Sequence, residues 1–215
     1  MINVDFFEDG LPVSVVIPYT TSPVRRKFFE QFVLPSIEAM NPAEIIINDN
    51  TGSAPKKRND GFAKATQKYI LFADDDIIFP VDFLERMIEA LVYSPPNVGY
   101  AYCGYKGIVM NPATHPIKNN FDIKTLEFSG KRLKQGNYIS TMSLMRKEVF
   151  PGFDENLKRL QDYDIWLTLL KRGIEGVAVP GVEFLAFYLD TGITSNTNNE
   201  MDAIEAIRTK HSDIL

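Results

Sequence analysis

The first 75 residues alternate short apolar runs with segments of helical spacing, and this order constrains the fold more than any other feature. The apolar runs cover residues 13–17, 44–47 and 69–73 and are rich in β-branched or aromatic side chains. Residues 25–40 carry apolar side chains at helical spacing, and a second helix is expected at about 59–67. A β-α-β-α-β order favours a parallel sheet covered by helices, with ligands at the carboxyl ends of the strands.

The rest of the chain gives a more mixed pattern. Pro80 opens a further helix with one apolar face, and residues 98–110 indicate one or two strands. Residues 111–136 are polar and rich in turn dipeptides. Strand signals return at 138–145, and a helix is expected at 162–171. The second half should therefore hold a smaller, mixed sheet.

Charge and composition argue against several classes of partner and location. The net charge is −5, so no global basic field attracts nucleic acid, and we expect no nucleic-acid partner. No apolar run approaches the roughly 18 residues that span a bilayer, and residues 1–5 lack a signal-peptide pattern. A single cysteine, Cys103, fits a reducing compartment. We predict a cytoplasmic protein with no integral membrane segment.

Three consecutive carboxylates, Asp74, Asp75 and Asp76, follow the third apolar run. Their mutual repulsion must be relieved by a cation, by protonation or by solvent. Hard divalent cations prefer carboxylate oxygens, and Mg²⁺ takes one or two from the protein and the rest from water and phosphate. The alternative is a set of acids that favours the N-terminus of the next helix. We expect Mn²⁺ or Mg²⁺ together with a diphosphate at these residues.

Five segments carry a resemblance to a known family. They are residues 13–18, residues 46–51, the group Arg58-Asn59-Asp60-Gly61 with Ala65 and 69–72, the Asp74–Asp76 cluster, and residues 152–157 followed by 161–167. Together they resemble the family 2 glycosyltransferases of the GT-A fold over almost the whole chain, with the cluster at the Asp-x-Asp position. The resemblance implies one α/β domain over 1–215, whose mainly parallel sheet is flanked by helices. Its nucleotide-sugar-binding half would cover 1–105 and its acceptor-binding half 106–215.

The resemblance also implies an activity. A metal-dependent, inverting enzyme of this family transfers a hexosyl or deoxyhexosyl group from a nucleoside-diphosphate sugar to a hydroxyl acceptor. A UDP-sugar is the favoured donor here, with dTDP- and GDP-sugars as alternatives. The acceptor would be a glycan, a lipid-linked saccharide or a glycoprotein.

On the donor side, the resemblance assigns the base-contacting loop to Asp49 and the loop after the first strand to Pro18, Tyr19 and Thr20. Asp49 can accept a hydrogen bond from the base, or can simply make an Asx turn after the strand. Asp74 and Asp75 would contact the donor as well as the metal. Arg58 would neutralise donor charge, or would lie at the surface.

On the acceptor side, the resemblance makes Asp162 the general base, with Asp164 supporting it. Both residues also stand where acids cap and favour a helix N-terminus. Trp166 could pack against an acceptor sugar or belong to the core.

Three other positions bear on the assignment. His115 and His211 have no partner pattern, and both are expected at the surface. Where many family members place a histidine, residues 188–192 offer Asp190 as a stand-in.

Two other functions compete with this one. A nucleotidyltransferase has a similar sheet and metal, but it needs a Gly-rich phosphate loop after its first strand, and residues 18–23 contain no glycine. A catalytically inactive sugar-nucleotide-binding module would keep the donor site without turnover. The acidic cluster together with Asp162 favours the enzyme.

Overall fold

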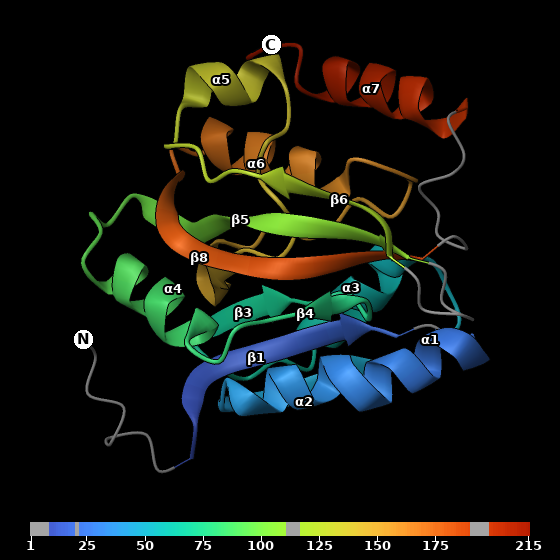
Figure 1. Ribbon diagram of the computed structural model, residues 1–215. Helices are drawn as coiled ribbons and strands as arrows, with labels where there is room; N and C mark the ends of the chain where they lie inside the picture. Colours follow the sequence, from blue (N-terminus) through green and yellow to red (C-terminus); the bar gives the residue numbers. More distant parts are fainter. Residues whose placement is uncertain (1–8, 20–21, 111–116, 190–197) are drawn as a thin grey trace.

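The computed structural model describes residues 9–19, 22–110, 117–189 and 198–215, and Figure 1 shows helices packed around one curved sheet. The strands of this sheet are β1 (Leu11–Pro18), β2 (Pro42–Asn48), β3 (Tyr69–Phe72), β4 (Ile77–Ile78), β5 (Val98–Met110), β6 (Ile117–Ile123), β7 (Leu144–Arg146) and β8 (Glu175–Leu189). They run in the order β2-β1-β3-β7-β5-β8-β4, and β6 pairs with β5.

The helices lie on both faces of the sheet. They are α1 (Pro23–Phe28), the π-helix Phe29–Val33, α2 (Leu34–Ala39), α3 (Ala54–Phe62), α4 (Phe83–Val92), α5 (Gly130–Gln135), the 3₁₀ turn Lys147–Val149, α6 (Gln161–Lys171) and α7 (Asn198–Lys210). In Figure 1, α1 and α2 lie along one side of the sheet, and α5, α6 and α7 lie on the other. No helix within the described ranges is both long and apolar enough to cross a bilayer.

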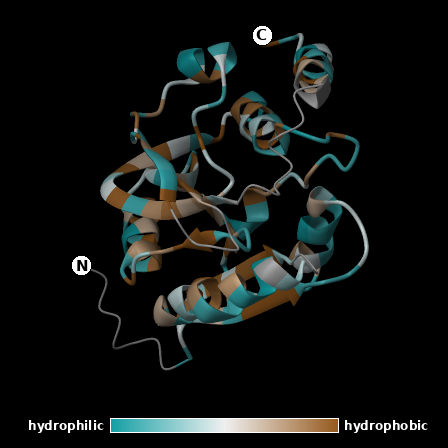
Figure 2. Ribbon diagram, turned by 45° about the vertical axis from the view of Figure 1, so that its right-hand side comes forward, coloured by the Kyte–Doolittle hydropathy of each residue, from teal (hydrophilic) through white to brown (hydrophobic). Residues whose placement is uncertain are grey.

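The sheet separates two hydrophobic cores, because successive side chains of a strand point to opposite faces. Val15 and Leu71 belong to the core under α1, α2 and α4, whereas Val16 and Phe72 belong to the core that contains Trp166 of α6. Figure 2 shows the same division, with brown apolar stretches on the strands and on the inward sides of the helices. Strands β1 and β3 are therefore buried on both faces, which explains their nearly continuous apolar sequence.

The predicted parallel start of the sheet is confirmed, since β1 pairs in parallel with both β2 and β3. The strands of the second half join the same sheet: β7 runs antiparallel between β3 and β5, and β5 runs parallel to β8. The α/β fold class is as predicted. The expected boundary at residue 105 falls inside β5, which both halves share.

Three elements differ in their boundaries or content from the prediction. The helix expected at 25–40 forms, but it contains the π-helix directly before Pro35, whose ring cannot follow a regular α-turn. The helix expected at 59–67 instead spans Ala54–Phe62, because Ser53 caps its N-terminus and Pro55 occupies its first turn. The turn-rich stretch 111–136 contains β6 and α5.

Candidate active site

The loops after β1 and β2 lie side by side at the carboxyl ends of the parallel strands. Pro18 pairs with Asn48 at the ends of these strands, and the Tyr19 amide donates to the Asn48 carbonyl over 3.0 Å. The Tyr19 ring is buried against Phe29, and its carbonyl accepts a 2.7 Å hydrogen bond from Lys57 Nζ. The Tyr19 ring is therefore part of the core and is not exposed to a ligand. Thr20 lies outside the described residues.

The turn after β2 is made by Asn48 and not by Asp49. Asn48 is buried, its side-chain amide donates to the Lys57 carbonyl over 2.8 Å, and its Oδ1 accepts from the Asn50 amide over 3.3 Å. The Asx turn expected as one role of Asp49 thus belongs to its neighbour. Asp49 is exposed at the end of the strand.

The three aspartates follow β3 and are paired with two arginines. Arg25 of α1 forms ion pairs with Asp75 and, at 2.7 Å, with Asp76, while Arg58 of α3 pairs with Asp74. The side chains of Asp74 and Asp76 are 31% and 24% exposed, whereas that of Asp75 is only 4% exposed. Asp74 and Asp76 are therefore the two carboxylates that a ligand can reach.

The cluster holds more carboxylate than its arginines offset. Burial raises the pKa of Asp76 to about 7, with Arg25 lowering it and the charges of Asp74 and Asp75 raising it further. A divalent cation would relieve this repulsion, and oxygen ligands fit Mn²⁺ or Mg²⁺. Among the described residues, no group of three or more His, Cys, Asp and Glu side chains could hold a metal by itself. The residues present fit an ion that completes its shell with phosphate and water.

Arg58 lies between the acidic cluster and the start of α6. Its side chain is buried, its guanidinium lies 5.3 Å from the centre of the Phe153 ring, and it pairs with Asp74. The same positive charge partly opposes the rise in the pKa of Asp162 that burial causes. The surface position considered for Arg58 is therefore wrong, and this residue connects the two halves of the site.

Asp162 occupies the first turn of α6, next to Asn137 and near the charge of Arg58. Burial raises its pKa, and the Tyr163 amide (2.9 Å), a hydrogen bond from Asn137 and the charge of Arg58 partly oppose that effect. The helix begins after Leu160, which has a left-handed φ of 58° and provides no side-chain cap. Asn137 was not anticipated from the sequence, because it lies 25 positions earlier in a loop without a motif of its own.

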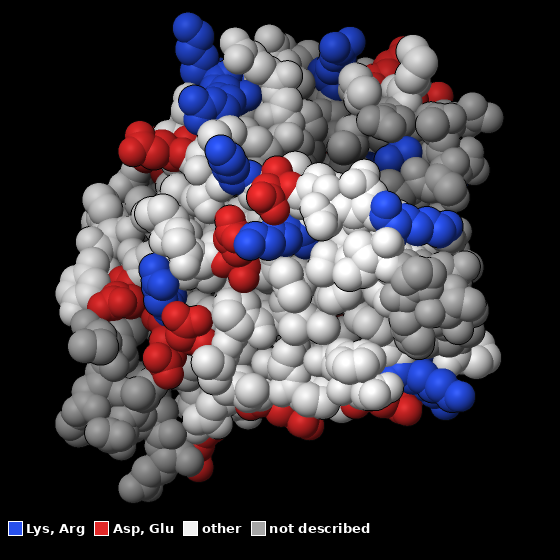
Figure 3. All heavy atoms as spheres, in the orientation of Figure 1, with Lys and Arg blue, Asp and Glu red and all other residues white. Residues whose placement is uncertain are grey.

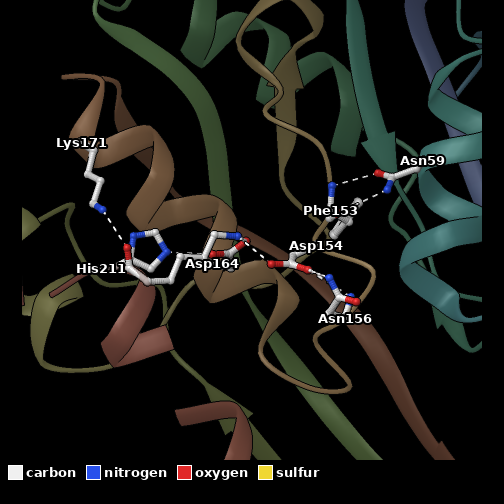
Figure 4. Close-up of polar contacts among 8 residues, drawn as sticks. Asn59, Phe153, Asp154, Asn156, Asp164, Lys171 and His211 are labelled. Carbon is white, nitrogen blue, oxygen red and sulfur yellow. Dashed lines mark hydrogen bonds and ion pairs between the residues drawn. The ribbon is translucent and has the colours of Figure 1, made fainter. Parts of the chain in front are cut away.

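Asp164 is buried and makes its contacts on the other side of α6 (Figure 4). Its carboxylate accepts from Lys210 Nζ at 2.9 Å and lies 2.8 Å from His211 Nε2. His211 is 1% exposed, so the expected surface position is wrong. His115 lies outside the described residues.

Asn59 joins the two halves by a two-point contact that Figure 4 also shows. Its side-chain amide donates to the Phe153 carbonyl over 2.9 Å, and its Oδ1 accepts from the Phe153 amide over 2.8 Å. The residue next to Arg58 on α3 thereby holds the loop that precedes α6.

Trp166 does not line the site, and the acceptor contact expected of it requires correction. It is 1% exposed, stacks on Tyr100 at 4.6 Å between ring centres, and donates from Nε1 to the Ile139 carbonyl over 3.0 Å. The flat apolar ring and the N–H donor, which could both contact an acceptor sugar, are therefore used inside the core.

The position where a histidine was sought is occupied by an aromatic pair. The hydroxyls of Tyr188 and Tyr105 lie 3.2 Å apart, and the Phe187 amide donates to the Asp76 carbonyl over 2.9 Å. Burial, most of all, and the nearby charge of Asp76 raise the pKa of Tyr188. The Tyr188 side chain therefore lies close to the acidic cluster. Asp190, considered as a stand-in ligand, is outside the described residues.

Charges of both signs are interspersed on the face shown in Figure 3, with a gathering of basic side chains over α5. Those of Lys131, Arg132 and Lys134 are exposed there. This group of basic residues is thus a solvated helix face.

Comparison with known proteins gives three kinds of match. The model of the family "Glycosyl transferase family 2" matches residues 36–152. An uncharacterized glycosyltransferase of Haemophilus influenzae is 27% identical over 182 residues, which cover 78% of this chain and 58% of that protein. This chain therefore spans less than two thirds of the length of that relative.

The solved structures include residues 1–349 of S. aureus TarS. Its complex with UDP-GlcNAc has a TM-score of 0.58 at 12% identity and covers 93% of this chain and 66% of that one. Its complex with UDP has a TM-score of 0.54 at 13% identity and covers 93% and 65%. At this identity the likeness shows a shared fold.

Proposed function

Because this chain belongs to glycosyl transferase family 2, we propose that it transfers a sugar from a UDP-sugar to a hydroxyl acceptor, with inversion and with the help of a divalent cation. The observation that carries the proposal is the position of Arg58, which is buried, pairs with Asp74 of the acidic cluster and lies near enough to Asp162 for its charge to oppose the burial that raises the pKa of Asp162. A diphosphate bound at the acidic cluster and an acceptor hydroxyl bound at Asp162 would therefore lie on either side of the buried Arg58 guanidinium.

The donor would bind at the carboxyl ends of β1, β2 and β3. The exposed carboxylate of Asp49 can accept a hydrogen bond from the N3–H of uracil, and the Pro18–Tyr19 backbone lies beside it. The complexes of S. aureus TarS with UDP and UDP-GlcNAc, which share the fold, support this donor class.

Asp74 and Asp76 would hold the cation, since both are accessible, and Asp75 would stay paired with Arg25. When bound, a divalent cation offsets charge on the departing diphosphate as a Lewis acid. Arg25 and Arg58 lie at the same carboxylates and can donate hydrogen bonds to phosphate oxygens. The chain thus brings two cationic side chains to the place where negative charge develops.

Asp162 would accept the proton of the acceptor hydroxyl as that oxygen attacks the anomeric carbon. The new bond forms between the acceptor oxygen and the anomeric carbon, on the face opposite the diphosphate. The bond to the diphosphate breaks, its electron pair leaves with the diphosphate, and the configuration at the anomeric carbon is inverted. A base must be deprotonated to act, and Arg58 and Asn137 favour the ionised form of Asp162 against its burial. A hydroxyl of a glycan, a lipid-linked saccharide or a glycoprotein could serve as acceptor.

The nucleotide preference is a first test. UDP is expected to bind more tightly than GDP, because the exposed carboxylate of Asp49 can accept a hydrogen bond from the N3–H of uracil; dTDP, whose thymine has the same N3–H, is the runner-up. Calorimetric titration of each diphosphate in Mn²⁺ would measure the order. A clear preference for GDP would contradict the assignment of the base pocket.

Arg25 gives a second test that does not depend on turnover. Because its guanidinium pairs with both Asp75 and Asp76, it competes with a cation for the cluster. A hydrogen bond to a charged group contributes about 1.5–3 kcal/mol, so Arg25→Gln should raise the affinity for Mn²⁺ alone by roughly tenfold.

Paramagnetic resonance of free Mn²⁺ would measure that affinity in the absence of nucleotide. Arg26→Gln is the matched control, because Arg26 lies over the Tyr19 ring at 5.9 Å. Equal Mn²⁺ affinity for Arg25→Gln and the unmodified protein would refute the competition.

A turnover assay separates the enzyme from a sugar-nucleotide-binding module. Screening UDP-, GDP- and dTDP-sugars for Mn²⁺-dependent hydrolysis needs no acceptor. Tight UDP binding without hydrolysis or transfer would favour the inactive module.

A further inference from the structure

The C-terminal segment that starts at Lys210, the last residue of α7, reaches the back of the candidate base. We propose that Lys210 and His211 are positioning residues that hold Asp162 in place through Asp164. The inference rests on the proposed role of Asp162 and goes beyond it, because it adds a part of the chain with no expected role in the site.

Asp164 is the point at which the segment meets α6. Both of its carboxylate oxygens are engaged, Oδ2 by Lys210 Nζ at 2.9 Å and Oδ1 by His211 Nε2 at 2.8 Å. Asp164 and His211 are 2% and 1% exposed, so the contact is sheltered from water. His211 Nδ1 is buried as well and has no hydrogen-bond partner in the described part of the chain. The contact with Asp164 is therefore the one hydrogen bond that the imidazole makes within the described residues.

Helix geometry links this contact to the base. Residues two apart on an α-helix differ by about 200° in direction. Asp164 therefore faces the end of α7, while Asp162 points away from it, toward Asn137 and Arg58. Leu160, in the left-handed conformation, supplies no side-chain cap to α6, and the Tyr163 amide of the first turn donates to Asp162 itself. Because the residue before the helix does not anchor the first turn, its position depends on contacts such as those of Asp164.

Lys210 also reaches the loop before α6. Its Nζ lies 2.8 Å from Asp154 Oδ2, and the neighbouring Phe153 is held by Asn59 of α3 (Figure 4). Asn59 is adjacent to Arg58, whose charge lies near Asp162. The contacts form a circuit from α3 through the loop and Lys210 to Asp164 of α6, and the charge of Arg58, next to Asn59 on α3, acts on Asp162 at the start of the same helix.

The circuit fixes the distance between the base and the diphosphate side of the site. Reacting groups must be held within a fraction of an ångström, and a displacement of about 1 Å can cost on the order of 100-fold in rate. Loosening Lys210 should therefore act on catalysis more than on donor binding, because the donor residues belong to β1–β3 and α3.

The test compares Lys210→Met with Lys210→Arg in the full chain. Lys210→Met should lower kcat for transfer at least roughly tenfold while leaving KM for the UDP-sugar and the calorimetric Kd for UDP within about twofold. Lys210→Arg keeps a cation that can reach both aspartates and should restore most of kcat. The pair His211→Leu and His211→Gln should behave in the same way, since glutamine keeps a donor towards Asp164.

Lys171→Met is the matched control. Lys171 binds the same segment, at Asp213 (2.5 Å) and at the Lys210 carbonyl (3.1 Å), without contacting Asp164. It should keep kcat within about twofold of the unmodified protein. If Lys210→Met is unstable, Asp154→Asn breaks only the arm to the loop and should show the same kcat loss with unchanged KM.

Unchanged kcat in both Lys210→Met and Asp154→Asn would overturn the inference. So would a fall in the Lys210→Arg variant as large as that in Lys210→Met, because charge at this position would then not matter. Failure of the proposed function looks different. In that case Asp162→Asn itself would retain transfer, whatever the Lys210 variants do.

Discussion

Replacing Asp162 by asparagine is expected to slow sugar transfer at least about 100-fold, while UDP and Mn²⁺ bind almost as before. Loss of a general base costs roughly 10²–10⁴-fold in rate. Asparagine keeps the size of the side chain and can still accept the Tyr163 amide, which donates to Asp162 over 2.9 Å. The helix start should therefore remain folded, and only the proton acceptor is lost. Steady-state transfer kinetics with calorimetry of UDP binding would measure both quantities.

The pH profile gives the same prediction a second readout. Because burial raises the pKa of Asp162, the acidic limb of kcat/KM should lie above the range of an ordinary aspartate. Activity requires the ionised base, so it falls as the pH drops through that raised pKa. The limb should be missing from the residual activity of Asp162→Asn.

Asp164→Asn is the companion variant and should be milder. Asp164 is buried against His211 and Lys210 and cannot reach an acceptor, so its loss acts through the position of α6. An inactive Asp164→Asn beside a near-normal Asp162→Asn would show that the two roles are reversed. Near-normal transfer by both variants would place the base elsewhere.

Local sequence patterns predicted much of the fold. The β-branched run at 13–17 and the apolar run at 69–73 became β1 and β3 because such strands are buried on both faces. The apolar face after Pro80 became α4. The acidic cluster follows directly from the end of β3, so its place at the carboxyl ends of the strands could also be foreseen.

Contacts between distant residues could not be foreseen in the same way. His211 and Asp164 lie 47 residues apart, and Arg25 and Asp75 lie 50 apart, without a local motif to connect either pair. The run Lys56-Lys57-Arg58 shows why charge patterns alone are ambiguous. Successive residues on a helix point about 100° apart, so Lys56 pairs with Asp60 at the surface while Arg58 is buried beside Asp74.

Asp76→Asn is expected to remove most of the Mn²⁺ dependence of UDP binding. Asp76 is one of two accessible carboxylates of the cluster, and burial together with its acidic neighbours makes its charged form costly without a cation. Asparagine keeps an oxygen but lacks the charge that a divalent ion requires. Asp75→Ala should also lose the dependence, because it frees Arg25 to pair with Asp76 alone.

UDP titrations in Mn²⁺ and in EDTA would measure the dependence for each variant. Asp82→Asn is the matched control, because Asp82 follows the cluster closely in sequence but is 51% exposed and pairs only loosely, at 3.8 Å, with Arg86. It should bind UDP like the unmodified protein under both conditions. If the unmodified protein itself binds UDP equally well in Mn²⁺ and in EDTA, then Arg25 and Arg58 alone neutralise the diphosphate. In that case the cation has no part in donor binding.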